Sequence, residues 1–203
     1  MATRDIRSKE NMKDISLIGF MGCGKSSVGR ILATLLPECR LIDLDTYIEE
    51  KQSKEIPEIF NEYGEAAFRQ MEREALEEIF SDHARPRAIL SLGGGTVTSE
   101  SCRQLIRCHT DCFYLRATTG TLLSNLEGHS EGRPMLSSAL PPSTEIPNEK
   151  DGLRQRIESL MRTRSPQYLA TAHHIIDIDG QTFAQIATLI KETVEYNTLN
   201  IRQ

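Results

Sequence analysis

The sequence has no apolar run near the roughly 20 residues that a membrane-spanning helix needs. Its first residues mix both charge signs without an apolar stretch, so they do not resemble a secretory signal, and we expect residues 1–13 to form a loose tail. It also lacks a surplus of positive charge, because the formal net charge is −5. A binder of duplex nucleic acid needs a basic face. These absences predict a cytoplasmic protein with neither a membrane partner nor a nucleic-acid partner.

The cysteines lack the pattern of a disulfide scaffold. There are five, an odd number, and no two have C-x-x-C spacing. A chain of 203 residues can bury a sufficient hydrophobic core without disulfide bonds, so we expect reduced thiols in the cytoplasm. Three cysteines lie close to His109 in the sequence, but their spacing fits no metal-ligand pattern with paired close cysteines.

Residues 19–26, Gly-Phe-Met-Gly-Cys-Gly-Lys-Ser, match the phosphate-binding pattern G-x-x-x-x-G-K-[ST]. An apolar β-type run precedes the match and an amphipathic helical pattern follows it, which is the context that this loop requires. The glycines allow backbone N–H groups to point at phosphate oxygens, and the helix N-terminus adds partial positive charge. In this motif Lys25 reaches the β and γ phosphates and the Ser26 hydroxyl binds Mg²⁺. A plain glycine-rich turn is the alternative, and the flanking elements favour phosphate binding.

Short apolar runs alternate with helical patterns along the chain. Such runs, separated by more than ten residues, are typical of a parallel sheet buried on both faces. We therefore predict one α/β domain over residues 1–203, a three-layer sandwich with a five-stranded parallel sheet, flanking helices and the phosphate loop (P-loop). Chemistry is expected at the carboxyl ends of the strands. The predicted strands are residues 15–18, 40–43, 88–92, 112–115 and 174–178. The last predicted helix has an apolar stripe of Phe183, Ile186, Ile190 and Val194.

One region interrupts this alternation. Residues 128–152 are rich in Gly, Pro, Ser and Glu. A polar loop of this length inside a compact domain is usually a lid or a disordered insertion. We predict a mobile lid region over about 118–152.

Several polar side chains follow the predicted strands. Asp43 and Asp45 end the second strand, where residues two apart share a face, although an aspartate cap on a helix over 46–51 is also possible. A helix is expected to open at Gly64, and Arg69 and Glu72 are neighbours on one face of it. They form either an exposed pair or a guanidinium prepared to grip a carboxylate. The three glycines of 93–95 indicate a close approach to the backbone.

Taken in order, these segments resemble the shikimate kinase family. The matching text is GFMGCGKSSVGR, LIDLDTYIEE, IFNEYGEAAFRQME, LSLGGGTVTS, RPML and RSPQY, and it covers residues 15–195. The resemblance implies a nucleoside-monophosphate-kinase-like fold and transfer of the ATP γ-phosphate to the 3-hydroxyl of shikimate. This reaction belongs to chorismate and aromatic amino acid biosynthesis. A monomer acting on a small molecule is expected.

The resemblance also implies a role for each matching residue. The catalytic set is Lys25, Asp45 and Arg133. The ATP-binding set is Gly22, Cys23, Gly24, Lys25, Ser26, Ser27, Arg133 and Gln181, with Mg²⁺ held by Ser26 and Asp43. The shikimate-binding set is Asp45, Arg69, Gly94, Gly95, Arg164, Phe60 and Phe68, in which Arg164 is expected to follow a helix.

The chain departs from the family pattern at two places of interest. Cys23 stands where a small residue such as alanine is more frequent, and Asn125 lies about where a lid-entry arginine is usual.

Two rival interpretations of the function stay open from the sequence. One is another small-molecule kinase on the same fold, such as a gluconate or nucleoside-monophosphate kinase. The other is a nucleotide-binding module without turnover.

Overall fold

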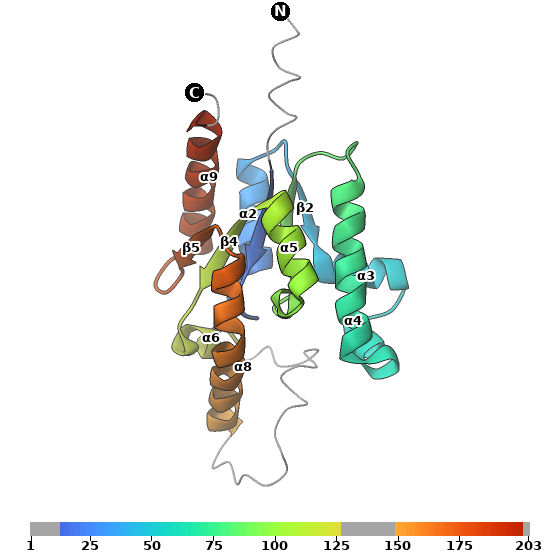
Figure 1. The fold of residues 1–203 in the computed structure, drawn as a ribbon. Coiled ribbons are helices and arrows are strands. Elements are labelled where there is room, and N and C mark those ends of the chain that lie inside the picture. Colours follow the sequence, from blue (N-terminus) through green and yellow to red (C-terminus); the bar gives the residue numbers. More distant parts are fainter. Residues whose placement is uncertain (1–12, 127–148, 201–203) are drawn as a thin grey trace, which may run out of the picture.

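The computed structural model describes residues 13–126 and 149–200, and its centre is a sheet of five parallel strands. The spatial order is β2-β3-β1-β4-β5, so the strand that precedes the P-loop lies in the middle (Figure 1). This confirms the predicted α/β fold with a five-stranded parallel sheet, and each predicted strand differs by at most two residues at an end. The strands are β1 (Asp14–Ile18), β2 (Arg40–Asp43), β3 (Ala88–Ser91), β4 (Thr110–Arg116) and β5 (His174–Asp177).

Helices cover both faces of the sheet and complete the three layers. Ile15 and Leu17 of β1 belong to a core cluster shared with α2 and α9, whereas Ile18 belongs to a second cluster shared with α3, α4 and α5. Because helices cover both faces, the central strands β1 and β3 are buried at every residue. The helices are α2 (Lys25–Leu35), α3 (Leu44–Gln52), α4 (Ile56–Ser81), α5 (Glu100–His109), α6 (Thr119–Leu126), α8 (Glu149–Thr171) and α9 (Phe183–Asn200), and a 3₁₀ turn, η1, spans Thr96–Thr98.

Helix α4 is kinked at Gly64. That residue has φ 78° and ψ 171°, a conformation that is nearly restricted to glycine. The sequence pattern predicted a helix opening at Gly64, but the structure has a helical segment on each side of it. The kink brings the two segments together, so that the rings of Phe60 and Phe68 lie 4.7 Å apart between centroids.

One further expectation needs correction. The Arg-Ser-Pro-Gln-Tyr segment at 164–168 does not follow a helix but lies inside α8, which continues through Pro166. The tertiary contacts of Tyr168, which is fully buried, hold this last part of the helix in place despite the proline. The predicted lid region of 118–152 includes α6 and the start of α8, and its middle part, with Arg133, lies outside the described residues.

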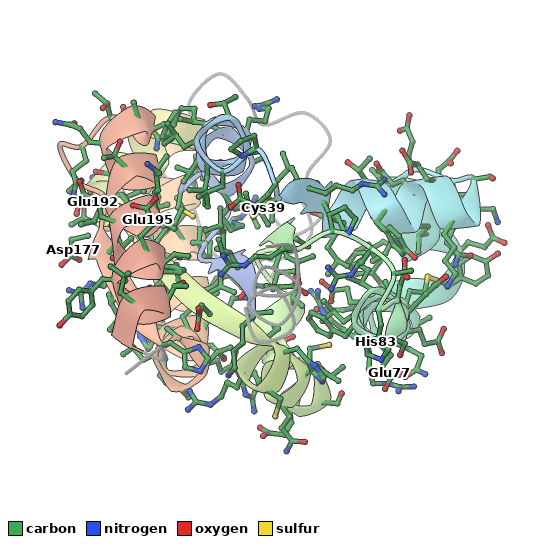
Figure 2. The ribbon with its side chains drawn as sticks, turned by 90° about the horizontal axis from the view of Figure 1, so that it is seen from above. Cys39, Glu77, His83, Asp177, Glu192 and Glu195 are labelled. Atoms are coloured by element: carbon green, nitrogen blue, oxygen red, sulfur yellow. The ribbon has the colours of Figure 1, made fainter. Side chains whose placement is uncertain are left out.

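No helix within 13–126 or 149–200 combines the length and apolar character that crossing a membrane requires. Figure 2 shows the molecule from above, with Glu192 and Glu195 of α9 on one side and Glu77 of α4 on the opposite side.

Candidate active site

A cavity of about 780 Å³ opens at the carboxyl ends of β1, β2 and β3. Its walls combine the P-loop after β1, the two aspartates after β2, the glycines after β3 and one arginine of α8. The predicted phosphate-binding and acceptor-binding residues therefore share one cavity. Those on its wall are Gly22, Gly24, Lys25, Ser26, Ser27, Asp43, Asp45, Phe60, Phe68, Arg69, Gly94, Gly95 and Arg164.

The P-loop has the conformation of an anion site. Gly22 and Gly24 have φ values of 81° and 87°, which favour glycine because other side chains are strained there. Gly24 is the N-cap of α2, and no side chain of the described residues caps this helix end, so its first N–H groups are available to a ligand. Lys25, only 9% exposed, donates from Nζ to the carbonyl oxygens of Gly19 (2.9 Å) and Phe20 (3.1 Å). The ammonium group is thus held against the loop that surrounds the anion site.

Ser26, Asp43 and Ser91 form an oxygen-rich cluster beside the loop. The Ser26 hydroxyl donates to Oδ2 of Asp43 at 2.8 Å and lies 3.2 Å from Oγ of Ser91. Mg²⁺ prefers oxygen ligands and keeps several waters, usually with one or two carboxylates and substrate phosphates. The described residues contain no group of three or more His, Cys, Asp or Glu side chains that could hold a metal, so Mg²⁺ at Ser26 and Asp43 would need the donor phosphates as further ligands.

Asp45 faces the same cavity, but not for the predicted reason. The strand ends at Asp43, and α3 begins at Leu44 instead of Thr46, so strand alternation does not align the two carboxylates. Asp43 is the N-cap of α3, and its Oδ1 accepts a hydrogen bond from the backbone N–H of Asp45 at 3.2 Å. Burial, followed by the charges of Glu72 and Asp43, raises the pKa of Asp45 to about 6. Asp45 is therefore a carboxylate whose proton affinity suits proton transfer near neutral pH.

Arg69 is oriented by a buried carboxylate. Its Nη1 donates to Oε2 of Glu72 at 2.6 Å, and Glu72 is 0% exposed. Glu72 also accepts a hydrogen bond from the Thr96 hydroxyl. Burial raises the pKa of Glu72, and the charge of Arg69 opposes this rise. The pair is not an ordinary exposed ion pair, and Glu72 holds the guanidinium in one orientation.

Another donor of Arg69, Nη2, can exchange its present partner for an incoming ligand. Nη2 contacts Glu65 at 3.0 Å, but the Glu65 side chain is half exposed, so this contact contributes little free energy and can be exchanged. The Nε atom is buried and has no hydrogen-bond partner among the described residues. Nη2 can thus turn to a ligand carboxylate while Glu72 keeps its Nη1 contact.

Arg164 and Tyr168 converge on the glycine segment from α8. Nη1 of Arg164, which is 3% exposed, donates to the Gly94 carbonyl at 3.3 Å, and the Tyr168 hydroxyl donates to the same oxygen. Burial raises the pKa of Tyr168, so its hydroxyl remains a donor. These contacts set the position of Gly94 and Gly95 at the cavity wall.

Two predicted residues, Cys23 and Gln181, do not line the cavity, and a third lies outside the described residues. The Cys23 thiol is buried, and its backbone N–H donates to the Phe20 carbonyl at 3.2 Å. The amide of Gln181 donates to the Asp177 carbonyl, and its contact with ATP stays a prediction. Arg133 lies outside the described residues, so its role also stays a prediction.

Sequence reasoning did not assign Ser91, Asn125 or Phe183 to the site, although all three line the cavity. Ser91 is the last residue of β3, two positions before the glycine segment, and that position at the carboxyl end of a buried strand was an available signal. Asn125 donates from Nδ2 to the Gly22 carbonyl at 2.9 Å, which ties α6 to the P-loop. Nothing in the local sequence indicates that contact, because the two residues are separated by 103 positions.

Comparison with known proteins identifies the family of the chain. The family model described as shikimate kinase matches residues 21–195. A shikimate kinase of Dictyoglomus turgidum is 34% identical over 88% of this chain and 95% of its own length. That of Chlorobaculum tepidum is 40% identical over 76% of each chain.

A solved structure agrees at the level of the backbone. The structure of shikimate kinase from Acinetobacter baumannii in complex with shikimate superposes with a TM-score of 0.79 at 29% identity. It covers 94% of this chain and 97% of the solved one. Since the family model and these relatives span most of the sequence and share its fold, the chain belongs to the shikimate kinase family.

Proposed function

We propose that this chain is an ATP-dependent kinase that phosphorylates shikimate at its 3-hydroxyl, with Asp45, Arg69 and Arg164 holding the acceptor. The observation that carries the proposal is that the phosphate loop and a cationic acceptor site open into the same cavity. Family membership supports it, because the family is defined by this reaction. Family membership favours shikimate over gluconate or a nucleoside monophosphate as the acceptor. It also favours catalysis over nucleotide binding alone.

The chemistry follows from where the charges lie. Phosphoryl transfer passes through a loose transition state, so positioning and charge stabilisation account for most of the catalysis. Lys25 lies at the phosphate loop, and Arg69 and Arg164 lie at the acceptor end. Asp45 would accept the hydrogen bond of the attacking hydroxyl and then its proton. Mg²⁺, held through Ser26 and Asp43, would neutralise phosphate charge.

A coupled assay of ADP release tests the proposal directly. The purified full chain is supplied with ATP, Mg²⁺ and one of three acceptors: shikimate, gluconate or AMP. We expect turnover with shikimate alone, identified by a product with one added phosphate. Turnover with gluconate or AMP in place of shikimate would assign the chain to another kinase of this fold, and no turnover with any acceptor would support a binding module.

The raised pKa of Asp45 predicts a particular pH dependence. A carboxyl group with its ordinary pKa of 3.8 would stay ionised at pH 5, but Asp45 has a pKa of about 6. The protonated form cannot accept the hydroxyl proton, so kcat/KM for shikimate should fall about tenfold per unit below about pH 6. The profile is measured at constant ionic strength, with folding checked by circular dichroism at each pH. A flat profile down to pH 5 would contradict the assignment of Asp45 as base.

A substitution at Gly95 should disturb the acceptor site without disturbing the fold. Gly95 has φ −107° and ψ −7°, which alanine can adopt, but its Cβ would lie 2.2 Å from Nη2 of Arg69. Gly95→Ala therefore forces the guanidinium to move, and we expect the KM for shikimate to rise about tenfold through a lost charge-assisted hydrogen bond. The KM for ATP and the Tm should change little.

Gly120→Ala is the matched control for this prediction. It lies in α6, and the nearest atom to its Cβ would be Oγ1 of Thr118 at 3.8 Å. The control should keep both KM values. If Gly95→Ala also kept the wild-type KM for shikimate, the position assigned to Arg69 in the acceptor site would be wrong.

The remaining expectations about this protein stay predictions. They are a single P-loop kinase domain, a monomer, and a cytoplasmic location in which the cysteines are reduced. Sedimentation of the purified chain, at the protein concentrations used in the assay, would decide between a monomer and a larger assembly.

A further inference from the structure

The end of α6 lies against the P-loop at a single residue, Gly22. The Asn125 side chain donates from Nδ2 to the Gly22 carbonyl oxygen at 2.9 Å. The next residue, Leu126, is 1% exposed, and a Cβ at Gly22 would lie 2.9 Å from its Cγ. Packing of Leu126 on the glycine therefore holds the Asn125 amide within reach of the loop.

The peptide group between Gly22 and Cys23 is held from both sides. Its carbonyl accepts the hydrogen bond from Asn125, and its N–H, which belongs to Cys23, donates to the Phe20 carbonyl at 3.2 Å. Gly22 has φ 81° and no side chain that would restrict rotation of this peptide group. The two hydrogen bonds therefore limit that rotation, and one of them comes from a residue 103 positions further along the chain.

The orientation of this peptide group matters for an anion bound in the loop. The loop binds phosphate through N–H groups that converge on it, whereas a carbonyl oxygen turned toward the phosphate would repel it. Gly22 and Asn125 both line the cavity, so their hydrogen bond lies at the wall of the phosphate site. A bond that keeps the Gly22 carbonyl on Asn125 thus keeps the loop in a conformation that can receive phosphate.

The amide of Asn125 brings no charge of its own to the donor. Among the described residues that line the cavity, the cations are Lys25, Arg69 and Arg164, and both arginines lie at the acceptor end. An arginine at position 125 would add positive charge near the phosphates, but asparagine is neutral. Its contribution is therefore expected to come through the loop that it contacts.

We propose that Asn125 is a positioning residue for phosphate binding, because its hydrogen bond to Gly22 fixes the P-loop before the donor arrives. The inference rests on the proposed function only in that it takes a nucleoside triphosphate as the donor. Loss of the bond should weaken the binding of ligands that are held through their phosphates, whether or not they carry a nucleoside.

The first test measures phosphate binding without turnover. ATP and inorganic tripolyphosphate are titrated by calorimetry, at a fixed Mg²⁺ concentration, into the wild type and Asn125→Ala. The Asn125 side chain is exposed on a helix, so the variant should keep the wild-type Tm. We expect the Kd of ATP and the Kd of tripolyphosphate to rise by the same factor, about two- to tenfold, which is the range for one hydrogen bond between neutral groups.

Hydrogen exchange separates positioning from direct contact with the ligand. It is followed by mass spectrometry of the P-loop peptide in the protein without ligand. The Cys23 amide should exchange several-fold faster in Asn125→Ala than in the wild type, because its peptide group is then held from one side only. A side chain that only touched the ligand would raise the Kd without changing this exchange.

Ser124→Ala is the matched control, since Ser124 precedes Asn125 in α6, is also exposed and lines the same cavity. It should keep the wild-type Kd values and exchange. An unchanged Kd of tripolyphosphate in Asn125→Ala would overturn the proposal, and so would raised Kd values with unchanged exchange. Equal effects of the two variants would also overturn it. Shikimate turnover by the wild type reports separately on the proposed function, so each idea can fail without the other.

Discussion

Replacing Asp45 by asparagine should lower kcat with shikimate by about 10²- to 10⁴-fold, the range typical for loss of a general base. Asparagine keeps the shape of the side chain and can still receive a hydrogen bond from the hydroxyl, but it cannot take the proton. The KM values for shikimate and ATP should change much less than kcat. Single-turnover measurement of product formation in rapidly mixed samples would show that the chemical step is slowed.

The same substitution should stabilise the fold, which distinguishes lost chemistry from lost structure. The folded pKa of Asp45, about 6, lies above the value of 3.8 expected in the unfolded chain. The ionised carboxylate therefore lowers stability above about pH 6, and this effect disappears as the pH falls toward 4. Asp45→Asn should show a raised Tm at pH 7 to 8 and no gain near pH 4. A variant with wild-type kcat, or with a lowered Tm at pH 8, would contradict the role and environment assigned to Asp45.

Replacing Arg69 by lysine should raise the KM for shikimate about 10- to 100-fold, with kcat at saturation changed little. A lysine ammonium keeps a positive charge for Glu72, which is fully buried, so the variant avoids an unpaired buried carboxylate. It cannot present the planar fork that binds a carboxylate through two parallel hydrogen bonds. The loss corresponds to about 1.5–3 kcal/mol for a hydrogen bond to a charged group.

Arg73→Lys is the matched control for this change. Arg73 lies one turn further along α4 and pairs with Glu77, which Figure 2 places at the side of the molecule opposite α9. The Arg73 side chain is 30% exposed, and its ion pair is of the surface type that contributes little. Kinetics of both variants are measured with shikimate varied at saturating ATP, alongside thermal unfolding. Similar KM values for the two variants would show that Arg69 does not bind the acceptor carboxylate.

Most of the layered fold and the phosphate site could be predicted from local sequence. The strand, glycine-rich loop and helix of residues 14–35 are adjacent in the chain, and their geometry depends on local backbone preferences. The same holds for Ser26 and Lys25, whose positions follow from the helix start. The helix boundaries at Leu44 and Gly64 were less predictable, because capping by Asp43 and a glycine kink compete with simple periodicity.

The acceptor site could be predicted as a set of residues, but not as a geometry. Arg69 and Glu72 look like a surface pair in the sequence, and only packing against Thr96 and the glycine segment buries Glu72 completely. Arg164 was expected after a helix, whereas the contacts of Tyr168 keep it inside α8. The raised pKa of Asp45 is likewise invisible in the sequence, since it depends on burial and on carboxylates from three other positions.

The amino-acid sequence by itself determined the class of the protein: an α/β kinase of the shikimate kinase family, with a phosphate loop whose spacing is a local property. The tertiary structure alone decided that Phe183 lines the site, how Glu72 orients Arg69 and why the pKa of Asp45 is raised. The reason is physical. Backbone curvature arises from neighbouring residues, whereas burial and charge interactions arise from segments that meet only after the chain has folded.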